Sequence, residues 1–368
     1  MKRVQFTLLG FVFCALITFS ACIKDNSGLA TGAYTKGIFI VNEGLPSSQG
    51  TISFLKRDSG TIANDIFSAA NGGAKVGGVI NSINYWLNFV YIMSATPGKM
   101  DIVDPYTFRL TQTIADTNFV NPQFFAGIAS YSVGGTIVNK AYITDFGPGD
   151  SSGRVQIYSL DANQVTGYIP TGYGTKQLLQ LSSGVMLALN SGIPGTPNWA
   201  DSTVAVIDIV ADTVIKNYIV GVNPNSMVQD ANNDIWVLGS KSSNPNLGGV
   251  LSRIHGGNVD INFSVPAGSA HLAVDSTAHY LYFAGGDNKL YVKDIINFGA
   301  NAPTLFTVPG LSLTSPYGIG FDYSTGYMLL TDAKDKNTPG TLYVIDTRQK
   351  KIIYTVPVGI NPGSFLYE

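Results

Sequence analysis

The chain has 368 residues, with 22 Lys and Arg against 24 Asp and Glu, so its formal net charge is −2. This balance excludes the basic surface that nucleic-acid binding requires. Only Glu43 and Glu368 are Glu, so nearly all acidic residues are Asp, and 41 Gly and 17 Pro accompany them. Because Glu favours helices whereas Asp, Gly and Pro favour turns, this composition predicts an all-β protein.

The N-terminus has the pattern of a secretory signal peptide. A short basic segment precedes an apolar run over residues 6–19, which is too short to span a bilayer comfortably. The run ends in FSAC at residues 19–22, which is similar to a bacterial lipobox, with Phe where Leu or Val is usual. We expect residues 1–21 to be a lipoprotein signal peptide and Cys22 to carry the lipid. The alternative is an ordinary signal peptide followed by an incidental cysteine.

Removal of this peptide has two consequences. Cys14 would leave with it and Cys22 would be lipidated, so the mature chain would have no thiol for a disulfide, a metal or a nucleophile. Residues 22–36 are mostly small and polar, which predicts a flexible tether. We expect a cell-envelope protein with a palmitate-bearing anchor in the outer membrane, facing either the periplasm or the cell exterior.

One hairpin pattern recurs along the rest of the chain: a small residue, an alternating apolar run, a polar turn and a second alternating run. The copies begin at Gly50, Gly98, Gly153, Ser202, Gly249, Asn288 and Gly340. Their mean spacing is about 48 residues, and a second, looser hairpin lies between them, as in residues 226–239. Such alternation predicts antiparallel strands, and two hairpins per repeat predict the four-stranded blade of a β-propeller.

The two ends of the chain complete this pattern. Residues 361–368 supply a first strand without a second, and residues 37–42 supply a second strand without a first. Joined, they would make a seventh blade that closes the ring and removes its exposed edges. We therefore expect residues 37–368 to form one seven-bladed β-propeller, an all-β fold whose last blade contains both terminal strands.

The repeat also resembles a known family. Residues 202–239, STVAVIDIVADTVIKNYIVGVNPNSMVQDANNDIWVLG, are similar to the YVTN/YncE-type repeat, and the last copy repeats the Ile-Asp, Val-Gly and Asn-Pro elements between residues 345 and 362. The two copies that begin at Gly249 and Asn288 lack the Ile-Asp element. The opening GIFIVNEG at residues 37–44 resembles the start of Bacteroidetes surface-lipoprotein propellers.

This resemblance implies a ligand class and a partner. Some members of that lipoprotein family capture corrinoids (vitamin B12) and pass them to a TonB-dependent transporter. The resemblance therefore implies that the chain binds a scarce nutrient such as a corrinoid, and that a TonB-dependent outer-membrane transporter is its partner.

In a propeller, the loops between second and third strands gather around one mouth of the central channel. Several of these loops are long here, over residues 42–50, 145–153 and 190–202, whereas the turns of the opposite face are short. Long loops on one face favour a binding site, with neutral insertions as the alternative. We predict ligand-binding residues among the following: Asn42, Glu43, Asp145, Tyr173, Asn190, Trp199, Asp201, Lys241, Asp287, Tyr317, Asp332 and Lys334.

Two of these residues carry the sharpest hypotheses. Glu43 is a long carboxylate in a chain that otherwise uses Asp, so it could reach across the mouth to an amide-rich ligand; the alternative is that it accepts backbone hydrogen bonds in its own turn. Trp199 lies in the longest loop and offers a flat apolar surface, or it folds back onto that loop. Aromatic residues within strand patterns, such as Tyr142 and Trp236, are predicted to be core.

Enzymatic sites are weakly supported. None of the three His lies in an HxH or HExxH spacing, and no GxSxG nucleophile elbow occurs. Residues that could imitate the metal ligands of lactonase propellers are Asn42, Glu43, Asp145, Asn190 and Asp332, although Asp is also a common turn residue. We expect a non-enzymatic, lipid-anchored ligand-binding propeller without a metal or cofactor. The alternatives are a protein- or glycan-binding scaffold and a lactonase-like metal-dependent hydrolase.

Overall fold

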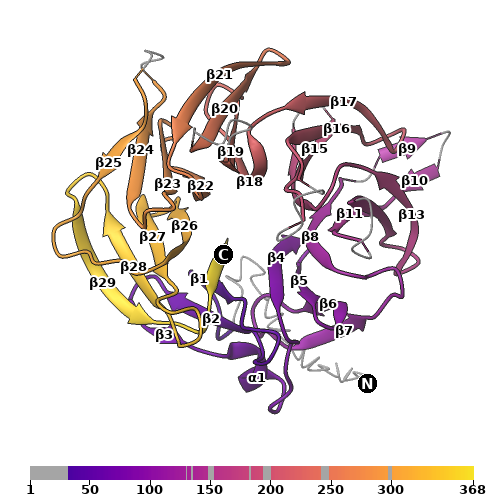
Figure 1. Cartoon of the computed structure of the whole chain (residues 1–368). Helices are drawn as coiled ribbons and strands as arrows, with labels where there is room; N and C mark the ends of the chain where they lie inside the picture. Colours follow the sequence, from indigo (N-terminus) through magenta and orange to yellow (C-terminus); the bar gives the residue numbers. More distant parts are fainter. Residues whose placement is uncertain are drawn as a thin grey trace, which may run out of the picture. The chain divides into compact units, whose positions relative to one another are not determined.

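The computed structural model describes residues 32–129, 131–133, 136–147, 153–181, 184–193, 200–241, 248–296 and 301–368. In these residues, seven four-stranded antiparallel sheets stand side by side around a central axis (Figure 1). The predicted seven-bladed β-propeller is therefore confirmed. The described residues contain one short α-helix, α1 (Ile66–Ala70). No helix in this part of the chain is long and apolar enough to cross a membrane.

Each blade is built from strands that follow one another along the chain, and blade 7 alone combines both ends. From the innermost strand outwards, blade 1 comprises β4 (Ile80–Trp86), β5 (Phe89–Ala95), β6 (Gly98–Val103) and β7 (Leu110–Ile114), and blade 2 comprises β8 (Pro122–Gly127), β11 (Lys140–Asp145), β12 (Arg154–Ser159) and β13 (Gln164–Pro170). Blade 3 comprises β14 (Thr175–Gln180), β15 (Val185–Asn190), β16 (Thr203–Asp208) and β17 (Thr213–Ile219), and blade 4 comprises β18 (Val222–Gln229), β19 (Ile235–Lys241), β20 (Gly249–His255) and β21 (Asn258–Val265). Blade 5 comprises β22 (Ala270–Val274), β23 (Tyr280–Ala284), β24 (Leu290–Asp294) and β25 (Thr304–Phe306), and blade 6 comprises β26 (Pro316–Asp322), β27 (Tyr327–Asp332), β28 (Thr341–Asp346) and β29 (Lys351–Pro357). Blade 7 comprises β30 (Pro362–Tyr367), β1 (Gly37–Asn42), β2 (Thr51–Lys56) and β3 (Ile62–Ala63). A separate hairpin of β9 (Tyr131–Val133) and β10 (Thr136–Val138) lies outside the blades.

The core lies between neighbouring blades. The second strands β1 and β11 are buried along their whole length, because a blade covers each of their faces, whereas the outermost strands β21 and β29 alternate between exposed and half-buried residues. Trp236 of blade 4 packs in a cluster with Leu281 and Phe283 of blade 5. Tyr142 of blade 2 packs in the same way with residues of blade 3. The prediction that these aromatic residues are core is confirmed.

Blade 7 closes the ring as predicted. β30 pairs antiparallel with β1, with Ile38 opposite Tyr367 and Ile40 opposite Phe365. Arg57, just after β2, forms an ion pair with Asp322 of blade 6 at 3.0 Å. The closing blade is thus joined to its neighbour by charge as well as by packing.

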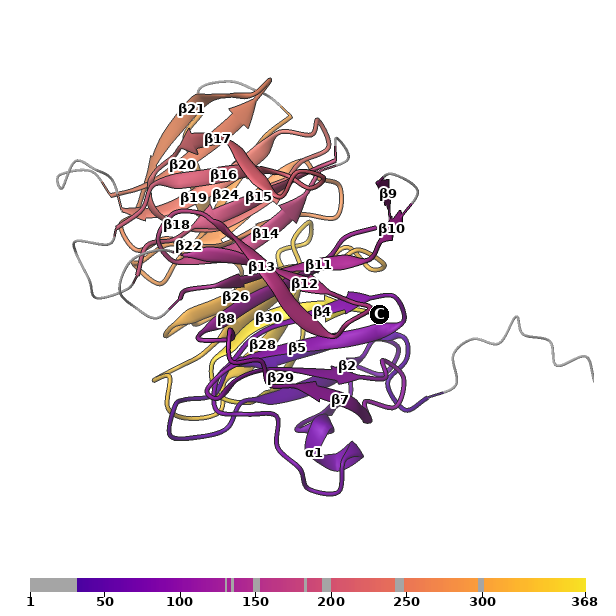
Figure 2. The same ribbon diagram turned by 90° about the vertical axis from the view of Figure 1, so that its right-hand side faces the viewer.

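The strand order defines two faces of the ring. The face that carries the loops between second and third strands, together with the connections between blades, is called the mouth face here; the opposite face, with the hairpin turns, is called the turn face. β1 runs from the turn face at Gly37 to the mouth face at Asn42. The C-terminal end of β30 and the β9–β10 hairpin lie on the turn face (Figure 2). Ahead of β1, Tyr34 packs on Phe54 with a ring-centroid distance of 5.4 Å.

Deletion of residues 361–368 tests the closure. We expect the melting temperature to fall by roughly 10 °C or more, because β1, β26 and β4 would each lose a neighbour near the channel. Circular dichroism during heating measures this. Replacement of the β9–β10 hairpin by a short Gly-Ser linker is the control, since these strands pair only with each other in the described structure. An unchanged melting temperature of the truncated chain would contradict the closure.

Candidate functional site

Every innermost strand begins with a β-bulge. In blade 2, Pro122 pairs with Asp145 and Phe124 pairs with Thr144, so Gln123 is an extra residue without its own partner. The same register shift occurs in the other six blades. A bulge redirects a side chain out of the regular alternation of the sheet. The seven bulge positions are Asn81, Gln123, Lys176, Asn225, His271, Tyr317 and Gly363, and we call them the mouth ring.

The mouth ring surrounds a cavity. Six of its residues, all except Tyr317, line a space of about 380 Å³ together with Glu43 and residues further down the innermost strands. All seven blades contribute to this lining. The cavity therefore depends on the closed ring, not on any one blade.

Glu43 occupies the place of the side chain that blade 7 lacks. The bulge residue of this blade is Gly363, and a Cβ there would collide with Oε1 of Glu43. The Tyr317 hydroxyl of blade 6 donates a hydrogen bond to Oε2 of Glu43 at 2.6 Å. Burial raises the pKa of the Glu43 carboxyl, while this hydrogen bond and the charges of Lys176 and Lys336 oppose the rise. The glycine at 363 thus makes room for a carboxyl group at the mouth.

His271 lies beside this pair. Its ring centroid is 5.4 Å from that of Tyr317, and its backbone has a φ of 60°. A positive φ is uncommon for a residue with a Cβ, and such strain often occurs at functional sites. Burial, with a smaller effect from Lys176 and Lys336, lowers the pKa of the imidazole to about 3. His271 is therefore a neutral hydrogen-bonding group at neutral pH.

The amides of the mouth ring also join neighbouring blades. Asn81 donates to the carbonyl oxygen of Pro122 in the next blade at 2.6 Å, and Asn225 donates to that of Ser269 at 2.8 Å. The Tyr317–Glu43 hydrogen bond makes the equivalent link between blades 6 and 7. The same residues hence line the cavity and fix the spacing of the blades around it.

The structure brings only two of the predicted site residues, Glu43 and Tyr317, together at the mouth ring. Four others lie at the ends of second strands in four different blades and bind backbone or neighbouring hydroxyl groups: Asn42, Asp145, Asn190 and Asp332. Asp145, for example, accepts backbone hydrogen bonds from Val120, Asn121 and Gly147. In these four blades, the side chains fasten the start of the innermost strand or the connection that enters it.

The remaining predicted residues lie elsewhere on the mouth face or outside the described part. Asp201 accepts hydrogen bonds from the backbone of half-buried Tyr173 and from Thr203. Lys241, Asp287 and Lys334 are exposed; Asp287 accepts a hydrogen bond from the Tyr291 hydroxyl of β24, and Lys334 donates to the Pro339 carbonyl oxygen of its own loop. Trp199 and Cys22 fall outside the described residues.

Sequence reasoning missed the other bulge residues and Lys336. A signal was present: in blades 2, 4, 6 and 7 a proline directly precedes the bulge residue, as in Pro122-Gln123 and Pro316-Tyr317. Proline cannot donate a ladder hydrogen bond and is tolerated at the first residue of a strand or at a bulge. The residue after this proline was therefore the position to examine.

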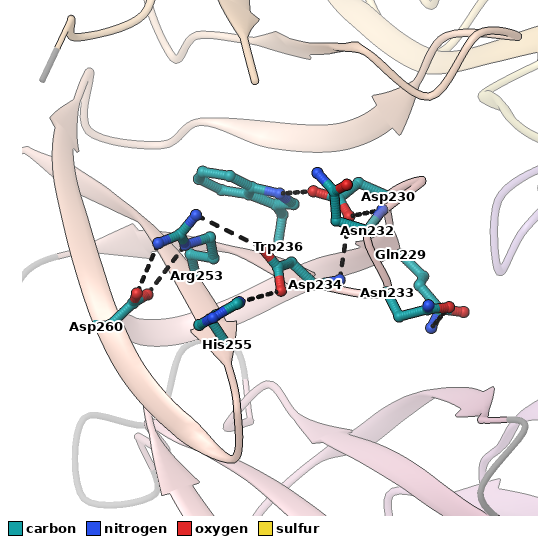
Figure 3. A network of polar contacts seen from close by, with 9 residues as sticks. All are labelled: Gln229, Asp230, Asn232, Asn233, Asp234, Trp236, Arg253, His255 and Asp260. Atoms are coloured by element: carbon teal, nitrogen blue, oxygen red, sulfur yellow. Dashed lines mark hydrogen bonds and ion pairs between the residues drawn. The ribbon is translucent and has the colours of Figure 1, made fainter. Parts of the chain in front are cut away.

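The turn face of blade 4 holds a second polar cluster (Figure 3). Asp230 accepts a hydrogen bond from the Trp236 indole at 2.9 Å, and Asp234 bonds the His255 imidazole at 2.6 Å. Arg253 lies between Asp234 and Asp260 and lowers the pKa of Asp260 by hydrogen bonding. These groups pair with one another and hold two hairpin turns. In the described residues, no three His, Cys, Asp or Glu side chains are placed to hold a metal ion.

Residues 36–331 match the family described as "Domain of unknown function (DUF5074)". The chain belongs to this family. No curated protein is significantly similar to it in sequence.

Solved structures show the same fold as this DUF5074 chain. A quinoprotein alcohol dehydrogenase-like protein from Bacteroides thetaiotaomicron has a TM-score of 0.64 at 15% identity, over 91% of this chain and 78% of its own. A candidate 6-phosphogluconolactonase from Bacteroides fragilis has a TM-score of 0.62 at 11% identity, over 92% and 100%. Hydrazine synthase from Kuenenia stuttgartiensis has a TM-score of 0.58 at 13% identity, over 87% and 98%. At such identities, these likenesses concern the fold.

We expect Asp332→Ala to lower the free energy of unfolding by about 1–3 kcal/mol, because it leaves the backbone N–H groups of Thr314 and Ser315 without their acceptor. Urea denaturation measures this. Asp287→Ala is the matched control on an exposed loop of the same face and should stay within about 0.5 kcal/mol. Equal effects of the two substitutions would show that Asp332 does not fasten its loop.

Proposed function

We propose that this DUF5074 propeller is a non-enzymatic binding protein of the cell envelope that holds a polar small molecule at its mouth ring. The observation that carries the proposal is the repeated bulge, through which six of the seven blades present one residue each to a shared cavity. Ligand sites are typically concave and contain a few convergent polar groups. Here the polar groups come from the bulge residues of blades 1 to 5 and from Glu43, which stands in for the side chain that blade 7 lacks.

A corrinoid is the first ligand to test. Its amide side chains could exchange hydrogen bonds with the amides of Gln123 and Asn225, and cobalamin also carries a phosphate that would suit the cationic side of the mouth near Lys176. A corrinoid is larger than the cavity of about 380 Å³, so we propose that it covers the mouth and inserts one edge. The resemblance to corrinoid-capturing lipoproteins, described above, favours the same choice. A glycan or a protein surface is the alternative occupant.

The direction of β1 decides from which face the preceding chain enters the propeller. The chain enters β1 on the turn face and leaves it on the mouth face at Asn42. If Cys22 is lipidated, the chain that leads to the lipid would leave the propeller from the turn face and not from the mouth. Such an attachment would leave the mouth free for a ligand and for transfer to a TonB-dependent transporter.

Retention of cobalamin tests the binding function. We expect the protein to keep the corrinoid visible absorption after incubation and desalting. Tyr317→Phe and Gln123→Ala should each weaken binding by about 1–3 kcal/mol, because each removes a polar group from the mouth ring. Asp287→Asn, on the same face but outside the ring, should bind as the parent does. If the parent retains no corrinoid, or if all variants bind equally, this ligand assignment is wrong.

Cys22→Ala tests the anchor. We expect this variant to move from the membrane fraction to the soluble fraction, or to accumulate as the unprocessed precursor, since lipidation would supply the membrane affinity. Fractionation followed by mass spectrometry of the N-terminus measures both outcomes. Cys14→Ala is the control and should fractionate as the parent does. An unchanged membrane fraction for Cys22→Ala would contradict lipid anchoring.

A further inference from the structure

Two lysines at the mouth carry ammonium groups that form no ion pair within the described part of the chain. Lys176 is the bulge residue of blade 3, and Lys336 lies in the loop between β27 and β28. Both are exposed, and in the described residues neither ammonium group has a hydrogen bond or ion pair. By contrast, Lys99 is paired with Asp101 at 2.6 Å.

The two lysines act on the same small region. Each contributes to the electrostatic environment of Glu43 and of His271. The Lys336 ammonium lies 5.8 Å from the centre of the Tyr317 ring, which in turn contacts His271. Two positive charges, one from blade 3 and one from blade 6, therefore act on the part of the mouth around Glu43 and His271, in a chain whose net charge is −2.

The neighbouring groups can assist an anion. The imidazole of His271 offers an N–H donor without a charge. The carboxyl group of Glu43 already accepts a hydrogen bond from Tyr317. A strong local positive potential raises the local concentration of anions and favours charge-assisted hydrogen bonds.

We infer that the part of the mouth between these two lysines is a subsite for an anionic group of the ligand, a phosphate or carboxylate held by Lys176 and Lys336 beside His271. This inference rests on the proposed binding function and adds to it the charge of the ligand and the place where that charge is bound.

Glu43 makes this subsite sensitive to protons. The charged or titratable groups that face it are Tyr317 from β26, Lys176 from β14, His271 from β22 and Lys336 from the β27–β28 loop. Burial already raises the pKa of Glu43, and a bound anion raises it further because two negative charges repel. Anion affinity is therefore highest where Glu43 is protonated and falls as the pH rises through the pKa of Glu43.

Histidine NMR gives a direct test, because the chain has only three His. Sodium sulfate, whose charge is constant over the relevant pH range, is the probe and is exchanged for sodium chloride at constant ionic strength. The His271 ring signal is assigned with His271→Asn, since Asn tolerates a positive φ. We expect a saturable shift of this signal alone, with His255 and His279 as internal references.

Variants decide the assignment. Lys176→Gln and Lys336→Gln should each weaken sulfate binding about tenfold, whereas Lys334→Gln should not, because Lys334 is on the same loop but donates to the Pro339 carbonyl oxygen. Sulfate affinity should fall roughly three- to tenfold in total as the pH rises through the pKa of Glu43, which burial raises, and Glu43→Gln should remove this dependence. Inorganic phosphate and acetate then show whether the subsite prefers a phosphate or a carboxylate.

Two results overturn the inference: no saturable shift of His271, or a shift that persists unchanged in both lysine variants. Its failure is separable from that of the proposed function. Cobalamin retention that depends on Tyr317 and Gln123, without a sulfate response, leaves the binding function and removes only the anion subsite. A lysine-dependent sulfate response without cobalamin retention supports the subsite and excludes that corrinoid.

Discussion

The β-bulge at the start of each innermost strand is the constraint on which the candidate site depends. Without it, the side chain at this position would follow the regular alternation of the strand and point toward a neighbouring blade. With one extra residue, side chains such as those of Gln123 and Asn225 line the shared cavity instead. The blades supply the stability of the ring through their apolar interfaces, and the bulges supply its polar centre.

The same backbone arrangement explains why so many acidic and amide residues on the mouth face are structural. Each connection between blades must turn sharply into the next innermost strand, and its backbone N–H groups need acceptors. Asp145 and Asp332 supply them from the adjacent second strand. Glu43, one residue beyond Asn42, is free of this task and reaches Tyr317 of the neighbouring blade. Position 43 needs the longer side chain of Glu, in place of Asp, because the carboxyl group has to reach across the space beside Gly363.

Alternating strands and the 48-residue repeat were sufficient to predict the blade number, the pairing of β30 with β1 and the aromatic core, because all three follow from hydrophobic periodicity. The site was less accessible. Loop residues such as Asn190 and Asp332 have the composition of a binding site, yet hydrogen bonds hold them in their own blades. Lys176 and His271 come from strands with no repeated sequence signal, so only the register of pairing reveals their common place. Glu43 and Tyr317 were found because one is an isolated Glu and the other follows a blade junction.

Native mass spectrometry of the protein, purified from the cells that produce it, tests the central claim most directly, because it needs no prior choice of ligand. The account predicts a small molecule that travels with the parent chain and with Lys334→Gln, and that is lost from a variant combining Lys176→Gln with Tyr317→Phe. A parent chain without a bound small molecule, or one that persists in the combined variant at equal occupancy, would contradict the claim that the mouth ring is the binding site.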